Sequence, residues 1–182
     1  MHDSAVRLFV ALYPPPDIAA HMLVQLSGLR MPEHRATPHD QVHLTLLFVG
    51  DVHHRDVPAV RESVERSASG IAPFPLRPDR LITLPSRGPS RLLALTTDAP
   101  AGLLEIHRRL VVRLARHGER RHTDRFNPHL TLCRFTHVGA CQAINEPAAA
   151  GPFTVARVRL MSSRLHAAGA RHEELGSCPL TG

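Results

Sequence analysis

The chain has 182 residues, which suits one domain or two small lobes that share a core, and 43% of them are apolar, which is enough to build that core. Its formal net charge is +6, and all 22 basic residues are arginines, so we expect anionic partners. The three cysteines are scattered and odd in number, which excludes a disulfide framework and fits a cytoplasmic protein. No apolar leader and no apolar run of about 18 residues is present, so we expect no contact with a membrane.

The first half of the chain predicts alternating strands and helices. A short apolar run over 6–12 reads as a buried strand that ends at three prolines. Apolar residues at helical spacing predict an amphipathic helix over 17–30, and two prolines predict a loop over 31–41. A strand over 42–49 follows and ends at Gly50. Asp56 then begins a helix that Gly70 closes.

The second half repeats this alternation less regularly. We predict proline-broken strands over 74–84 and 91–97, a helix over 99–117 and a basic loop over 119–127. A strand over 130–135, a short helix over 139–146, a strand over 153–165, a turn near Gly169 and a last strand over 172–178 complete the chain.

Two strands, 86 residues apart, carry the same four residues. His43-Leu44-Thr45-Leu46 lies in the first, and His129-Leu130-Thr131-Leu132 lies in the second. Side chains alternate between the faces of a strand, so the histidine and threonine of each copy share one face and the leucines share the other. Each copy therefore offers an imidazole beside a hydroxyl.

This duplication predicts an α+β fold with two pseudo-symmetric lobes. Each lobe would be an antiparallel sheet with helices packed outside, and the active cleft would lie between them. We expect one domain over 1–182, with lobes formed roughly from residues 1–90 and 91–182, and we expect a monomer.

Two facing histidines suit in-line displacement at phosphorus, because one ring can accept a proton from the attacking water while the other protonates the leaving oxygen. Thr45 and Thr131 would then donate hydrogen bonds to the non-bridging phosphate oxygens. Arg134 would add positive charge there. A single histidine on a strand is more often structural, so the prediction depends on the pair.

Four stretches resemble the RNA 2′,3′-cyclic phosphodiesterase (2′-5′ RNA ligase) family of the 2H phosphoesterase superfamily. They are the opening strand at 7–12, the two motifs at 43–50 and 126–134, and the closing hairpin at 163–180. The resemblance implies hydrolysis of RNA 2′,3′-cyclic phosphate ends to 2′-phosphates without metal, and also reversible 2′-5′ ligation. It implies that His129 activates water and His43 protonates the 3′-oxygen, although the sequence does not fix this order.

Some residues fit this interpretation less simply. Strict alternation places Arg134 on the face opposite His129, so a bulge or twist is needed for it to reach a phosphate. The same alternation places Phe48 in the core, with base stacking as the alternative, and places Cys133 on the histidine face as a packing residue. His172 occupies a position that is commonly aromatic in the family, and we expect it to affect packing only.

Other functions remain open from the sequence. The chain carries neither His-Glu-x-x-His nor a His-x-His motif, so we expect no metal and no other cofactor. Seven arginines between positions 108 and 125 either follow an RNA backbone or form a solvated surface. The alternatives to an enzyme acting on RNA ends are an RNA-end-binding module with little turnover and a phosphodiesterase for small cyclic nucleotides.

Overall fold

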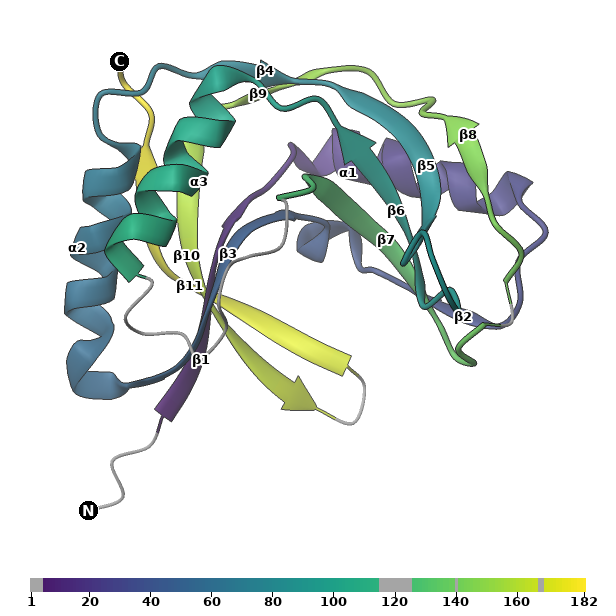
Figure 1. The fold of residues 1–182 in the computed structure, drawn as a ribbon, viewed down its shortest axis with the longest axis horizontal. Coiled ribbons are helices and arrows are strands. Elements are labelled where there is room, and N and C mark those ends of the chain that lie inside the picture. Colours follow the sequence, from purple (N-terminus) through teal and green to yellow (C-terminus); the bar gives the residue numbers. More distant parts are fainter. Residues whose placement is uncertain (1–4, 115–125, 140, 167–168) are drawn as a thin grey trace.

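The structure, a computed structural model, describes residues 5–114, 126–139, 141–166 and 169–182. Its main feature is a nine-stranded sheet in the order β11-β10-β1-β3-β7-β6-β5-β8, with β2 paired to β7 (Figure 1). The strand pairs with a given register are all antiparallel. The described residues therefore form the α+β architecture that the sequence predicts.

The bounds of the strands follow the predicted alternation. The main sheet contains β1 (Ala5–Leu12), β2 (His34–Ala36), β3 (Leu44–His53), β5 (Pro78–Leu84), β6 (Leu92–Thr97), β7 (His129–Phe135), β8 (Asn145–Pro147), β10 (Arg157–His166) and β11 (Gly169–Pro179). A separate small sheet pairs β4 (Phe74–Leu76) with β9 (Phe153–Val155).

In the described ranges, three α-helices cover the sheet from outside: α1 (Pro16–Val24), α2 (Val57–Ala68) and α3 (Ala101–Leu114). Short 3₁₀ turns lie at Gln25–Gly28, His39–Gln41 and His54–Asp56. The second and third helices pack together behind β3, β10 and β11, on the left of Figure 1. The first lies toward β5–β8, where the Ala149 N–H donates a 2.9 Å hydrogen bond to the side chain of Gln25.

The apolar face of each helix explains this packing. Val60 and Val64 of α2 and Leu103, Ile106 and Leu110 of α3 have no exposed surface, and they are spaced for one helical stripe. They meet the leucines on the inner face of the sheet. Burial of each such side chain contributes about 1.5–3 kcal/mol. One continuous core therefore lies between the helices and the sheet.

The two parts of the sheet do not coincide with the two halves of the chain. One part contains β1, β3, β10 and β11, and the other contains β2, β5, β6, β7 and β8. Each part thus draws strands from residues 1–90 and from residues 91–182, which differs from the expected division. The chain passes from one part of the sheet to the other several times. Within the described residues, a single pair of facing residues, Leu44 and Leu130, joins the two parts.

Two predicted segments are wrong. The predicted loop at 31–41 contains β2, a strand of three residues without the apolar alternation that would have predicted it. The short helix predicted over 139–146 is absent from the described residues there, and Asn145–Pro147 instead form the edge strand β8. Most of the basic loop predicted over 119–127 lies outside the described residues.

Candidate active site

The two duplicated motifs lie side by side at the centre of the sheet. Leu44 of β3 pairs with Leu130 of β7 in antiparallel register, and both leucines are fully buried. Extending this register by one residue each way places the histidine of each motif opposite the threonine of the other. The sheet thus brings two imidazoles and two hydroxyls onto its open face around a local two-fold axis.

Two bulges in β3 change the side-chain alternation after the first motif. Relative to β1, the strand gains one residue between Thr45 and Leu47 and another between Phe48 and Gly50. An extra residue reverses which face the following side chains occupy. Phe48 is therefore 67% exposed, on the open face with Phe9, whose ring centroid lies 6.4 Å away. The prediction that Phe48 belongs to the core is wrong.

A bulge in β7 acts in the same way on the second motif. Against β6, the strand gains one residue between Thr131 and Cys133, so that Leu132 and Cys133 are both fully buried. Arg134 returns to the open face and is exposed. The bulge that Arg134 needed is thus present. Cys133 is a packing residue, as predicted, but it lies on the core face and not on the face of His129. Burial raises the pKa of its thiol to about 11.

Both motif histidines are held by the same hydrogen bond. The Nδ1 of His43 lies 2.7 Å from the Gln41 carbonyl oxygen, and the Nδ1 of His129 lies 2.8 Å from that of Asn127. A carbonyl oxygen only accepts, so each Nδ1 carries the proton. The neutral tautomer therefore leaves each Nε2 as a free acceptor, and the backbone two residues earlier fixes the orientation of the ring.

The environments of the two histidines differ. Three rings surround His43: Tyr13 stacks on it with centroids 5.3 Å apart, and Phe9 and His172 each lie at 5.1 Å. Burial among these rings is the main reason that the pKa of His43 is lowered to about 4; the hydrogen bond to the Gln41 carbonyl partly opposes this shift, and the positive charge of Arg134 reinforces it. His43 is therefore neutral at pH 7 in the free protein.

Arg134 has a second arginine directly opposite. Arg35 of β2 pairs with Arg134 across the strands, so both guanidinium groups lie on one face. Within the described part of the chain, neither has an ion pair or a side-chain hydrogen bond. Like charges opposite each other destabilise a sheet, and an anion between them removes that cost. The pair is suited to bind phosphate.

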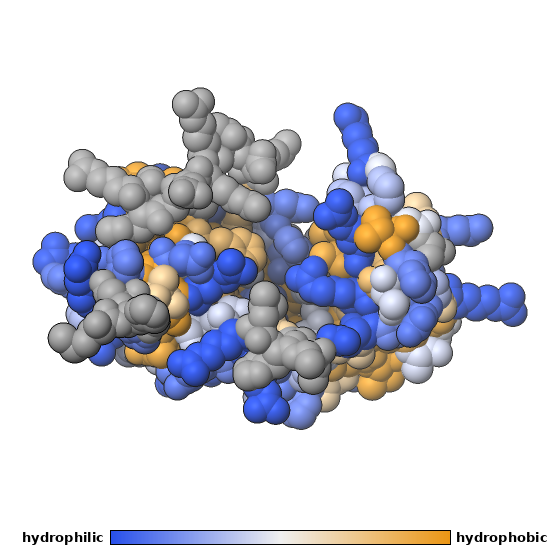
Figure 2. Space-filling model, turned by 90° about the horizontal axis from the view of Figure 1, so that it is seen from below, coloured by the Kyte–Doolittle hydropathy of each residue, from blue (hydrophilic) through white to orange (hydrophobic). Residues whose placement is uncertain are grey.

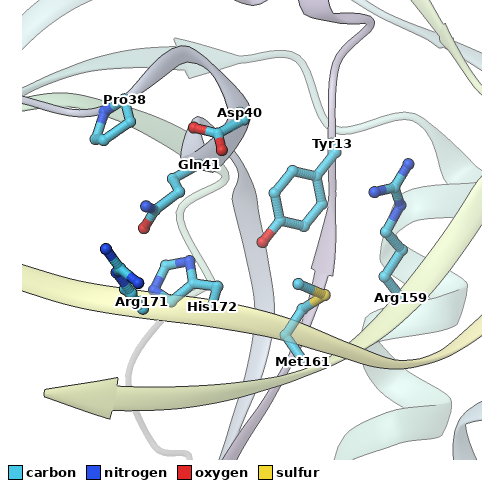
Figure 3. Close-up of a pocket in the computed structure, with 8 residues that line it drawn as sticks. All are labelled: Tyr13, Pro38, Asp40, Gln41, Arg159, Met161, Arg171 and His172. Carbon is cyan, nitrogen blue, oxygen red and sulfur yellow. The ribbon is translucent and has the colours of Figure 1, made fainter.

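A polar pocket of about 400 Å³ adjoins His43. Tyr13 and His172, which contact the His43 ring, line the pocket, together with Asp40, and Arg171 lies beside His172 (Figure 3). Burial raises the pKa of Tyr13 to about 12 and lowers the pKa of His172. Both side chains are therefore uncharged at neutral pH.

The open face of the sheet is a cleft between two masses of the molecule. Figure 2 looks into it from below and shows mainly hydrophilic side chains around the hollow. Among the residues that the structure describes, no three histidine, cysteine or acidic side chains lie together as metal ligands. No helix in the described ranges is long and apolar enough to cross a membrane.

The arginine-rich segment from 108 onward is only partly described. Arg108 and Arg109 of α3 both bond to Glu105 at 2.7–2.8 Å, and these bonds lower the Glu105 pKa to about 2. Both lie on an outer helix and not in the cleft. The remaining described member is Arg113, and Arg116, Arg120, Arg121 and Arg125 lie outside the described residues.

Sequence reasoning missed several residues of this face. Arg35 lies on an unpredicted strand, so nothing indicated its position. Phe9 of β1 and Tyr13, directly after this strand, are four residues apart, and this even spacing could have predicted that they lie on the same face of the sheet. His172 was predicted to affect packing, and its ring does pack against His43, but the sequence did not indicate that this partner would be a motif histidine.

Comparison with known proteins supports the fold and identifies the family. The model of the 2′-5′ RNA ligase superfamily matches residues 14–167. The structure of Escherichia coli LigT without ligand is 27% identical, with a TM-score of 0.79 over 98% of this chain and 99% of that one. LigT complexed with 3′-AMP is 26% identical, with a TM-score of 0.82 and the same coverage of both chains.

Two further solved structures share the fold. One described as a phosphoesterase is 27% identical, with a TM-score of 0.83 over 97% of this chain and 99% of that one. The protein TT0787 of Thermus thermophilus is 24% identical, with a TM-score of 0.84 over 96% and 97%. A search of curated proteins gave no match. With the family match covering most of its length, the chain belongs to the 2′-5′ RNA ligase superfamily of phosphoesterase enzymes.

Proposed function

We propose that this enzyme hydrolyses RNA 2′,3′-cyclic phosphate ends to 2′-phosphates, with His43 and His129 as acid and base. The observation that carries the proposal is the symmetric pair of imidazoles on adjacent strands. Each ring presents a free Nε2 because a backbone carbonyl holds its Nδ1. The neighbouring threonine hydroxyls are placed to donate to the oxygens of a pentacoordinate phosphorus.

The proposed reaction moves two protons. His129 takes a proton from water, whose oxygen attacks the phosphorus, and the bond from phosphorus to the 3′-oxygen breaks. His43, in its protonated form, gives a proton to that leaving oxygen, and the phosphate stays on the 2′-oxygen. Each proton transfer contributes roughly 10²–10⁴-fold to the rate. A 5′-hydroxyl of RNA in place of water would give 2′-5′ ligation by the same steps.

The remaining polar groups would stabilise the charge that builds on the phosphate. No hydrogen bond among the described residues occupies the hydroxyl of Thr45 or Thr131, so both are available to donate to non-bridging oxygens. Arg134 supplies a guanidinium on the same face. Arg35 beside it extends the positive surface toward the next phosphate of a nucleic acid.

RNA is the proposed substrate class because the open face combines arginines with an exposed aromatic ring. Phe48 is positioned as a platform on which a base can stack, and the solved complex of E. coli LigT with 3′-AMP supports a nucleotide as ligand. The three cysteines are free, in accord with a reducing compartment. We propose that the enzyme acts in the cytoplasm as a monomer.

The test is turnover of an oligonucleotide that ends in a 2′,3′-cyclic phosphate, in the presence of EDTA, with the product isomer identified by phosphorus NMR. We expect a 2′-phosphate and a loss of at least about 10²-fold in His43→Ala and in His129→Ala. His34→Ala is the matched control, because its Nδ1 makes the same kind of bond, 2.8 Å to the Pro32 carbonyl oxygen, outside the paired motifs.

The other outcomes separate the alternatives. Binding of the RNA end without turnover would indicate a binding module, and turnover of cyclic mononucleotides alone would indicate a small-nucleotide enzyme. A 3′-phosphate product would identify the 2′-oxygen as the leaving group. Activity that survives loss of both histidines, or that EDTA removes, would refute the mechanism.

A further inference from the structure

Unpartnered buried polar atoms are concentrated in one corner of the molecule. Five buried side-chain atoms have no hydrogen-bond partner among the described residues, and all come from the end of β1 or from β10 and β11: the hydroxyl of Tyr13, Nε of Arg159, Oγ of Ser162, Nδ1 of His172 and Oγ of Ser177. Three of them, on Tyr13, Arg159 and His172, belong to residues that line the pocket beside His43.

Such atoms need a partner from outside the described residues. Buried polar groups in folded proteins are nearly always hydrogen-bonded, and an unpartnered one is costly. Three of them around one pocket of about 400 Å³ indicate that solvent or a ligand supplies the missing bonds. Figure 3 shows the Tyr13 hydroxyl and the His172 ring around a common space with Asp40.

The charged groups of the pocket narrow the class of ligand. Asp40 and Arg171 both line it, and neither has an ion pair or a side-chain hydrogen bond in the described part of the chain. Arg159 is already paired with Glu174 at 3.3 Å. A purely anionic ligand would be repelled by the carboxylate of Asp40. A neutral ligand can donate N–H groups to the Asp40 carboxylate and offer ring-nitrogen or carbonyl acceptors to Arg171. The edge of a nucleobase carries this pattern of donors and acceptors.

The position of the pocket fits a nucleoside. Its lining residues Tyr13 and His172 contact the His43 ring, with centroids 5.3 and 5.1 Å away, so the pocket is one ring removed from the proposed proton donor. The oxygen that His43 would protonate belongs to the ribose of the terminal nucleotide. The base on that ribose therefore lies within reach of the pocket.

We propose that this pocket binds the base of the terminal nucleotide and selects among bases, through the Tyr13 hydroxyl, Asp40 and His172. The proposal rests on the proposed function and adds base selectivity to it. Phe48 lies on the other side of Phe9, as the β1–β3 register shows, so the aromatic platform and the pocket are separate surfaces.

The test compares kcat/KM for the four 2′,3′-cyclic mononucleotides in the wild type, Asp40→Asn and Tyr13→Phe. Asparagine keeps the shape of the side chain but loses its charge, and phenylalanine keeps the ring against His43. Ser162→Ala is the matched control, because it removes an unpartnered buried hydroxyl from the core face of β10, away from the pocket. We expect the wild type to prefer one base by about tenfold or more.

Selectivity in the variants decides the proposal. We expect Asp40→Asn to lower kcat/KM for the preferred base by about 10–100-fold and Tyr13→Phe by about 3–10-fold, with little change for the poorest base. Ser162→Ala should keep the wild-type preference. Equal rates for all four bases, or a preference unchanged in both variants, would show that the pocket holds water only.

A separate measurement distinguishes this failure from failure of the proposed function. If neither the cyclic mononucleotides nor an oligonucleotide with a 2′,3′-cyclic phosphate end is hydrolysed, the proposed function fails, and calorimetric binding of the four nucleoside 2′-monophosphates then tests the pocket alone. A preference in binding that Asp40→Asn removes would still support base selection. Equal affinities for all four would overturn it.

Discussion

Binding of phosphate in the cleft should raise the pKa of His43 by several units. In the free protein that pKa is about 4, because the ring is buried, so only about one molecule in 10³ carries the proton at pH 7. A proton donor must be charged when the substrate is bound. A negative charge about 4 Å from the ring, at an effective dielectric constant of about 20, contributes about 4 kcal/mol, or roughly three pKa units. Bound phosphate would therefore bring His43 close to half protonation at pH 7.

The assay is a pH titration of the imidazole resonances by NMR, with and without saturating inorganic phosphate. Spectra of His43→Ala and His129→Ala assign the two signals, and His34 serves as a remote control. We expect the His43 pKa to move from about 4 to near neutrality. If it stays near 4 with phosphate bound, His43 remains neutral in the complex. The roles would then be reversed, with His43 accepting the proton from water and His129 donating one.

Four further predictions concern stability and RNA binding. The pKa of His43 is about 6.5 in the unfolded chain and about 4 in the folded protein, so the unfolded state binds more protons between these pH values. Lowering the pH from 7 to 4.5 should therefore reduce the free energy of unfolding, measured in urea, by about 2–3 kcal/mol. An equal loss in His43→Ala would contradict this. Phe48→Ala should lower kcat/KM on oligonucleotides about tenfold without changing the urea midpoint, because its exposed ring contributes stacking and little core packing; an unchanged kcat/KM would exclude stacking. Arg35→Gln should reduce the salt dependence of oligonucleotide binding by a slope of about 0.7, and an unchanged slope would place Arg35 away from the RNA. Gly50→Ala should cost about 1–2 kcal/mol in the same unfolding assay, since its φ of +91° strains any L side chain although no atom lies within 4 Å of the added methyl group; wild-type stability would refute the strain.

Local patterns in the sequence predicted most elements of the fold and the shared face of the histidine and threonine in each motif. The apolar alternation of the two motifs placed His43 and Thr45 on one face with Leu44 on the other, and the structure agrees. Helical spacing located α2 and α3 to within a few residues. These features depend on side chains close together in the chain, which is why one sequence is enough to predict them.

Features that depend on cross-strand pairing were not predictable in this way. A bulge inserts one residue relative to a partner strand, and nothing in residues 44–49 or 130–134 identifies which residue is extra. Phe48 was therefore assigned to the wrong face of the sheet. For Arg134, the sequence indicated that a bulge was needed but not where it lies. The opposition of Arg35 and Arg134 likewise depends on a short strand whose partner lies about 100 residues away.

The interleaving of strands has a consequence for how this enzyme can arise and fold. A duplicated motif suggests two ancestral units, each able to fold alone. Here a fragment of residues 1–90 would contain β1 and β3 without β10, and β5 without β6. Neither fragment of a chain cut near residue 90 contains the full hydrogen-bonding neighbourhood of its own histidine strand. The two motif histidines thus come together only when both halves of the chain have folded, so a half-synthesised protein would contain only one of the two.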